Sequence, residues 1–161
     1  NYLNYWKELA ANDVKVDNGW ENAFYTDFSG SSGRGPRPIV VSYDSDPAFA
    51  VLSANPPVGE PSIAAIVADG TCFRQIEFVG ILKGTGRLDL AQKWIDFMLS
   101  TAFQEDMPLQ MFVFPVNPNA KLDPIFAKYL IQPKKIAEIS PQDIAANREK
   151  WIQAWTATVL P

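Results

Sequence analysis

The residues of this sequence best suited to chemistry are aromatic side chains that lie outside the helical stripes. Trp20 follows the turn signal Asn18-Gly19, and Tyr43 follows a short β-branched run at residues 39–41. In open α/β sheets, ligands bind just beyond the carboxyl ends of the strands, which is where we expect Tyr43. Aromatic faces at that edge would bind a flat or cationic ligand by stacking and cation–π attraction. The alternative is that both residues are ordinary packing residues.

Three further residues extend this candidate site. Phe49 follows Tyr43 in the same stretch, and Phe112 lies at the start of a short extended segment. Asp44 places a carboxylate beside Tyr43, where it could attract a cationic ligand. Asp44 and Asp46 could also be an acid–base pair. For Asp46, however, a role as N-cap of the helix that follows is the better explanation.

Most groups used in catalytic and metal sites are missing. The sequence has no histidine, which removes the commonest general base and metal ligand. Its one cysteine, Cys72, is expected to be a small buried residue. The glycines and the lysine of residues 80–86 are in the wrong order for a phosphate-binding loop. We therefore expect no catalytic residue, no metal ligand and no cofactor, and we predict that the chain is not an enzyme.

The charge of the chain argues against a nucleic-acid partner, and its hydropathy argues against a membrane-spanning segment. The formal net charge is −4, and a nucleic-acid partner would require a basic patch. No stretch approaches the ~20 apolar residues of a membrane span, and no signal peptide is recognisable. The sequence starts with Asn1 and not with Met, inside a helical pattern. We therefore expect a fragment or a processed product of a longer polypeptide.

Hydrophobic periodicity predicts helices and strands in alternation, and hence an α/β fold. Helical spacing or helix-start signals mark residues 2–11, 20–28, 47–52, 90–98, 100–103, 124–130 and 140–159. Asp123 and Ser140, each directly before proline, are the predicted caps of the last two helices. β-Branched or alternating runs predict short strands at residues 13–17, 39–43, 62–67, 75–83 and 113–116. Segments 29–38 and 53–61 are rich in Gly, Ser or Pro, so we expect two surface loops, the first of them flexible.

Most of the tryptophans lie on the apolar stripes of these predicted helices. They are Trp6, Trp94, Trp151 and Trp155. Stripes with this spacing bury one face of a helix, so we expect these four indoles in the core. Trp20 differs because it follows a turn.

Several motifs together resemble the thiamine-binding proteins of ABC importers, and the resemblance spans nearly the whole chain. The broadest motif is AQKWIDFMLS at residues 91–100 with Gln104 after it, which the related iron-binding proteins share. The narrower motifs are YWK at residues 5–7, GWENA at residues 19–23, SYDSDPAF at residues 42–49, FPV at residues 114–116 and the Trp-rich last helix at residues 140–155.

The resemblance implies the type II periplasmic-binding-protein fold. This fold has two α/β lobes joined by crossover strands, each with a mixed, mostly parallel sheet flanked by helices, and the ligand lies between the lobes. The chain, residues 1–161, would be the C-terminal half, with an incomplete lobe because the N-terminal half is absent. Residues 1 to about 70 and about 118–161 would form the second lobe. Residues from about 71 to 117 would cross toward the first lobe.

The resemblance also implies a function. The chain would be part of a substrate-binding component that captures thiamine, thiamine phosphate or thiamine diphosphate and delivers it to an importer permease. The ligand-facing aromatic residues would be Trp20, Tyr43, Phe49 and Phe112, with Asp44 beside them. At positions 49 and 112 the family more often has Tyr and Trp.

The implied location is periplasmic or otherwise extracytoplasmic, with a lipid anchor on the full-length protein and self-association of the fragment as open alternatives. Another ligand also stays open: ferric iron, a polyamine or another flat cation. Iron is disfavoured because the tandem Tyr-Tyr motif of the iron-binding relatives is absent. Two rivals from other classes are a small hydrolase or transferase, which lacks a nucleophile motif here, and a structural interaction domain.

Overall fold

A computed structural model describes residues 1–160, without the side chains of residues 31 and 32. Its helices are α1 (Tyr2–Ala11), α2 (Trp20–Asn22), the π-helical turn η1 (Ala23–Asp27), α3 (Ser29–Ser32), α4 (Asp46–Leu52), α5 (Leu88–Met98), α6 (Thr101–Met111), α7 (Pro124–Tyr129) and α8 (Pro141–Val159). Apart from α3 and a longer α6, these helices lie where the sequence predicts them. In this range no helix combines the length and the apolar character needed to cross a bilayer.

The starts of α7 and α8 follow from the predicted capping signals. Asp123 Oδ1 accepts a hydrogen bond from the backbone N–H of Ile125 at 2.8 Å. Ser140 Oγ accepts one from the backbone N–H of Asp143 at 3.0 Å. Each cap is followed by proline at the start of the helix. A capping oxygen satisfies a donor that the first helical turn leaves unpaired, and proline lacks that donor altogether.

The start of α4 differs from the prediction. Ser45 is the N-cap, without a side-chain hydrogen bond to the helix, and Asp46 is the first helical residue. The Asp46 carboxylate accepts a hydrogen bond from the backbone N–H of Tyr43 at 3.2 Å. The prediction that Asp46 is the N-cap is therefore wrong, because its side chain bonds backwards to the segment before the helix.

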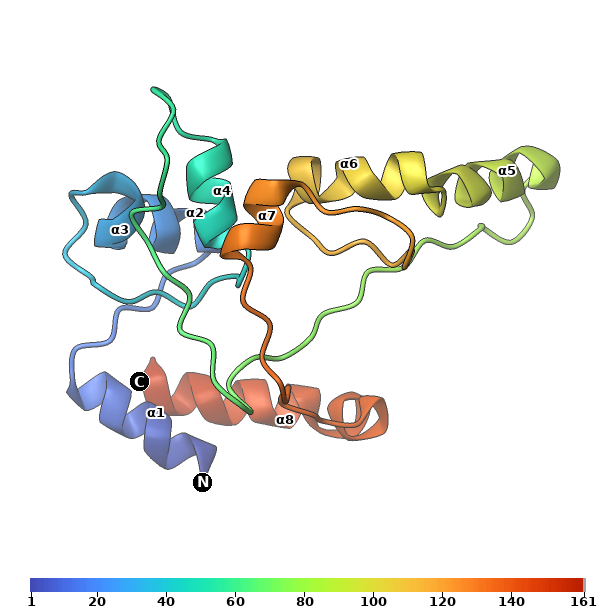
Figure 1. Cartoon of the computed structure of the whole chain (residues 1–161). Coiled ribbons are helices and arrows are strands. Elements are labelled where there is room, and N and C mark those ends of the chain that lie inside the picture. The colour runs from blue at the N-terminus through green and yellow to red at the C-terminus, as the bar shows by residue number, and fades with distance from the viewer. Residues whose placement is uncertain (161) are drawn as a thin grey trace.

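The helices form two layers and an arm (Figure 1). In one layer α1 packs against α8, and the indoles of Trp6 and Trp155 meet edge to face with centroids 5.4 Å apart. The other layer holds α2, η1, α3, α4 and α7, with α4 against α7. Helices α5 and α6 follow each other and extend sideways as an arm. Long extended stretches connect the two layers.

Buried apolar side chains gather in the layer that contains α4 and α7. They include Phe24 of η1, Ala48 and Val51 of α4, and Phe126 of α7. Phe126 is 0% exposed and meets Phe114 edge to face, with ring centroids 6.1 Å apart. Burying a side chain of this size stabilises the fold by about 1.5–3 kcal/mol. This layer therefore fixes α4, which carries Phe49 and directly follows Tyr43 and Asp44.

The predicted mixed, mostly parallel sheet is not confirmed within residues 1–160. The predicted strands lie in segments without regular structure, and Asp13 at the start of one has a positive φ of 61°. Backbone bridges in the described range are limited to two isolated parallel ones, Phe28 with Arg37 and Phe73 with Ala137. Helix hydrogen bonds are local, whereas a strand needs a neighbouring strand in register. The strand-like segments lack such neighbours in the described range. They consequently leave apolar side chains uncovered, and Phe78 is 91% exposed.

None of the four indoles predicted to lie in the core is fully buried. Trp6, Trp151 and Trp155 are half-buried, and Trp94 on α5 is 56% exposed. Helical spacing identifies which face of a helix is apolar and not what covers it. Leu90, on the same stripe of α5, is likewise exposed. The apolar face of the arm is therefore open over these residues.

Segment 29–38 is more regular than the predicted flexible loop. Its first four residues form α3, and Ser29 N donates to Arg37 O at 2.8 Å while Arg37 N donates to Asp27 O at 2.9 Å. Arg37 also forms an ion pair with Asp13, with Nη2 2.9 Å from Oδ2. Gly35 lies so close to the Asp27 carbonyl that a Cβ would collide with it. The other predicted loop, 53–61, is largely exposed as expected.

Candidate functional site

Trp20 and Tyr43 lie together near the start of α4. Trp20 is the first residue of α2, directly after its N-cap Gly19. The two ring centroids are 5.9 Å apart, with the planes inclined at 56°. The indole Nε1 of Trp20 donates to Ser42 Oγ at 2.6 Å, and Tyr43 is 57% exposed. Two residues far apart in the sequence thus form one aromatic surface.

Two further aromatic rings, those of Phe24 and Tyr25, pack against the Trp20 indole. Phe24, which is buried, stacks on the indole with centroids 4.8 Å apart and planes 19° from parallel. Tyr25 meets the same indole edge to face at 5.4 Å and is 47% exposed. The sequence interpretation missed Tyr25, because it lies inside a predicted helix. The available signal was its spacing five residues after Trp20, which a π-helical turn brings toward the same side.

A charged cluster holds α2 and η1 in place. Lys15 Nζ donates to Asp27 Oδ2 at 2.5 Å, and Asn22 Nδ2 donates to the same oxygen at 3.2 Å. The hydrogen bond from Lys15 lowers the pKa of the Asp27 carboxyl group, and the same bond raises the pKa of Lys15. The cluster keeps the segment before α2 against η1, and so fixes the backbone that carries Trp20.

Phe49 and Phe112 form a second aromatic contact, farther along α4. Their ring centroids are 4.6 Å apart and the rings meet edge to face at 78°. Phe112 is the C-cap of α6 in a left-handed conformation, with φ 55° and ψ 32°. Both side chains are partly buried. This contact joins the arm to α4, and whether the two rings also touch a ligand stays a prediction.

Gln104 determines the path of the chain after Phe112. It is buried, and its Oε1 accepts hydrogen bonds from the backbone N–H groups of Val116 at 2.7 Å and Asn117 at 3.4 Å. Its Nε2 donates to the carbonyl of Met98 at 2.7 Å. One amide side chain therefore ties the end of α5 to the segment that follows α6.

Two carboxyl groups lie beside the Trp20–Tyr43 surface. Burial raises the pKa of Asp44, and hydrogen bonds from its own backbone and that of Ser45 oppose this shift. Burial also raises the pKa of Asp46, with hydrogen bonds from Ser42 and Tyr43 opposing it and the charge of Asp44 adding to it. A bound cation would favour the ionised form of either carboxyl group. The site can therefore offer aromatic faces together with negative charge.

The five predicted site residues consequently fall into two groups. Trp20, Tyr43 and Asp44 lie near the start of α4, and Phe49 contacts Phe112 about one helical turn farther on. In the described part of the chain, His, Cys, Asp and Glu side chains form no group of three that could hold a metal ion. This arrangement is suited to stacking a flat ring and attracting positive charge.

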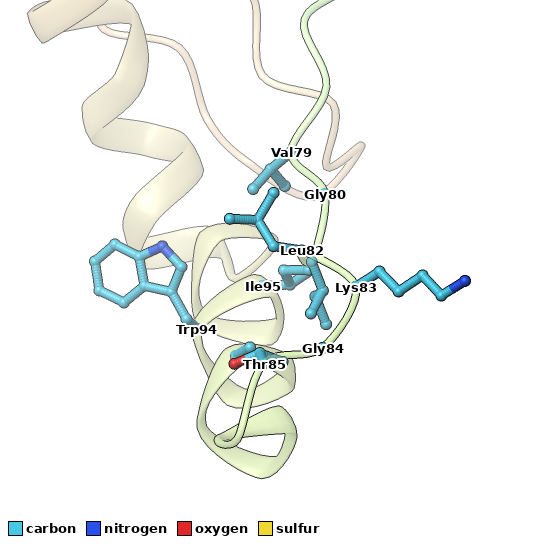
Figure 2. A pocket seen from close by; sticks show the side chains of 10 residues that line it. Val79, Gly80, Leu82, Lys83, Gly84, Thr85, Trp94 and Ile95 are labelled. Atoms are coloured by element: carbon cyan, nitrogen blue, oxygen red, sulfur yellow. The ribbon is translucent and has the colours of Figure 1, made fainter.

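An open pocket of about 470 Å³ lies elsewhere, between residues 79–85 and α5 (Figure 2). Apolar groups line it, among them Val79, Leu82, Trp94 and Ile95. The Lys83 side chain points away from the helix in Figure 2. Ligand sites place a few polar groups where they orient the ligand, and this pocket lacks a charged group directed inward. We therefore interpret the pocket as an apolar packing surface that is left uncovered, and not as a ligand site.

Comparisons with known proteins give a consistent result. A family model described as "Bacterial extracellular solute-binding protein" matches residues 2–136. The chain is 32% identical to the thiamine-binding periplasmic protein of Escherichia coli strain K12, over 96% of the chain and 44% of that protein. It is 30% identical to the same-named protein of Salmonella typhimurium over the same shares, and 28% identical to that of Brucella suis, over 94% of the chain and 43% of the protein. The chain thus spans less than half the length of these relatives. No solved structure matches it.

Proposed function

Because the chain belongs to the bacterial extracellular solute-binding protein family, we propose that it is the C-terminal half of the substrate-binding component of an ABC importer. Its ligand is thiamine or one of the phosphate esters of thiamine. The full-length protein is the longer polypeptide that contains this chain. The relatives named as thiamine-binding periplasmic proteins support this proposal.

The observation that carries the ligand assignment is the surface formed by Trp20 and Tyr43, with the Asp44 carboxyl group beside it. Thiamine has flat heteroaromatic rings and a permanent positive charge. Aromatic faces within reach of such a ring gain about 0.5–2 kcal/mol from cation–π attraction. An ionised carboxylate adds attraction for the same charge. Phe49 and Phe112 are proposed to border the ligand through the contact that joins α4 to the arm.

The lobes are proposed as follows. Residues 1 to about 70 and about 118–161 form the second lobe, and residues from about 71 to 117 cross toward the first. The sideways direction of α5 and α6 in Figure 1 supports this division. The unpaired extended segments and the exposed Phe78 and Trp94 support it as well. In the full-length protein, strands from the other half would complete the mixed, mostly parallel sheet of the type II fold.

The remaining features of the proposal follow from the transport role. The full-length protein acts outside the cytoplasm, delivers its ligand to the importer permease, and catalyses no reaction on the ligand. It needs no cofactor. A lipid anchor on the full-length protein is part of the proposal, and mass spectrometry would test it. Self-association of the isolated chain is another part, and sedimentation would test it.

A thermal-shift screen of the full-length protein tests the ligand assignment. The ligands are thiamine, thiamine phosphate, thiamine diphosphate, spermidine and ferric citrate. A ligand present at about 100 times its Kd stabilises the folded state by ~2.7 kcal/mol, which raises the melting temperature measurably. We expect the largest shift from a thiamine compound. A larger shift from spermidine or ferric citrate contradicts the assignment.

A further inference from the structure

Ser42 and Asp46 each hold one residue of the aromatic surface. Ser42 Oγ accepts the indole N–H of Trp20 at 2.6 Å. Asp46 Oδ2 accepts the backbone N–H of Tyr43 at 3.2 Å. Asp46 is 7% exposed, so the second bond ends on a buried group.

The direction of each bond follows from the chemistry of the groups. An indole N–H only donates, and an ionised carboxylate only accepts. The Ser42 hydroxyl is therefore the acceptor for Trp20, and the Asp46 carboxylate is the acceptor for the backbone N–H of Tyr43.

Each residue of the aromatic surface thus has its own acceptor. The Trp20 indole bonds to Ser42, and the backbone N–H of Tyr43 bonds to Asp46. Asp46 is in turn held as the first residue of α4, next to the buried Pro47 and Ala48. Its carboxylate bonds back to Tyr43, so its effect falls on a site residue and not on the helix alone.

We propose that Ser42 and Asp46 are positioning residues of the ligand site: Ser42 sets the orientation of the Trp20 indole through its bond to Nε1, and Asp46 holds the backbone of Tyr43. This inference rests on the proposed function for its consequence in binding. It goes beyond that function by assigning a role to two residues that do not themselves contact the ligand. Aromatic rings held in one orientation lose less freedom when a ligand binds.

The test compares serine variants in the full-length protein. Ser42→Ala removes the hydroxyl that accepts from Trp20, and Ser42→Thr keeps a hydroxyl. Ser53→Ala is the matched control, because Ser53 Oγ donates to the carbonyl of Phe49 at 2.7 Å at the other end of α4. Asp46→Asn is a second variant of similar size, which weakens the acceptor for the backbone N–H of Tyr43 without creating a cavity.

Two measurements separate positioning from stability. Calorimetry measures thiamine affinity, and urea denaturation measures the free energy of unfolding. We expect Ser42→Ala to lose about five- to tenfold in affinity, the value of one orienting hydrogen bond. Ser42→Thr recovers most of that loss, and Ser53→Ala binds like the wild type at similar stability. Wild-type affinity in Ser42→Ala, or an equal loss in Ser53→Ala, overturns the proposal.

The unliganded protein gives an independent readout. The indole Nε1–H resonance of Trp20, assigned by its disappearance in Trp20→Phe, reports the bond to Ser42 directly. We expect it to move upfield in Ser42→Ala and to stay in place in Ser53→Ala, and we expect the backbone amide resonance of Tyr43 to move in Asp46→Asn. If the Trp20 resonance moves but no variant or wild type binds thiamine, the Trp20–Ser42 bond exists and the thiamine assignment fails. If the resonance does not move, the positioning proposal fails whatever the ligand is.

Discussion

The replacement Gln104→Ala tests how the arm positions Phe112. The change removes a buried amide that accepts from the backbone N–H groups of Val116 and Asn117 and donates to the carbonyl of Met98. The bonds to Val116 and Met98 are both 2.7 Å long, and the bond from Asn117 is 3.4 Å long. Alanine offers neither a donor nor an acceptor, so these backbone groups lose their partner.

The magnitude follows from the number of good bonds. A neutral hydrogen bond contributes about 0.5–1.5 kcal/mol net, and the two short bonds dominate here. We therefore expect a loss of about 2 kcal/mol in local stability. Since every 1.4 kcal/mol is a factor of ten, the backbone N–H of Val116 should exchange with solvent about 30 times faster. Amide hydrogen exchange measures this rate even if the arm opens separately from the rest of the chain.

Gln110→Ala is the matched control on the same helix. Gln110 is exposed, and its Nε2 donates to Asp106 Oδ1 at 3.2 Å on the surface of α6. Surface substitutions of this kind usually change stability by less than about 0.5 kcal/mol. Unchanged exchange at Val116 in Gln104→Ala would refute the reasoning. An equal acceleration in Gln110→Ala would refute it as well.

Three further predictions concern the core, the acidic residues and the ligand. Phe126→Ala should destabilise the chain by about 3–5 kcal/mol in urea denaturation, because Phe126 is 0% exposed. Trp20→Ala should cost clearly less, and an equal loss would make Trp20 a core residue. Burial raises the pKa of Asp44, so its contribution to stability is greatest below its unfolded pKa and is lost as the pH rises through the folded pKa. The stability of wild type relative to Asp44→Asn should therefore fall as the pH rises above the ordinary pKa of an aspartate, and parallel curves would contradict this assignment. Residues 1–161 alone should bind thiamine weakly or not at all by calorimetry, because a cleft ligand needs both walls, and tight stoichiometric binding would contradict the lobe division.

Helices could be predicted from the sequence because their signals are local. Ser140 and Asp123 accept hydrogen bonds from the first turns of α8 and α7, as their positions before proline predicted. Trp6 and Trp155 meet across α1 and α8, as their apolar stripes suggested. Trp20 and Tyr43 also lie together, with ring centroids 5.9 Å apart, and their role in binding a ligand stays a prediction. The caps are set by spacing within one short segment, whereas the two ring contacts also need the folded chain.

The features that the sequence did not predict depend on partners far along the chain. The strands need neighbours in register, and the exposed Phe78 shows that this range does not supply them. Trp94 is exposed for the same reason, since periodicity does not identify a covering surface. Asp46 and Tyr25 were misjudged or missed because their roles depend on contacts with Tyr43 and Trp20, which only the folded arrangement establishes.

The most direct test of the central claim is thiamine binding to the full-length protein, measured by calorimetry with the wild type, Trp20→Ala and Tyr43→Ala. We predict saturable binding of one thiamine by the wild type. Each variant should fold and lose at least about tenfold in affinity, or ~1.4 kcal/mol. Absence of thiamine binding in the wild type, or equal affinity in all three proteins, would contradict the account.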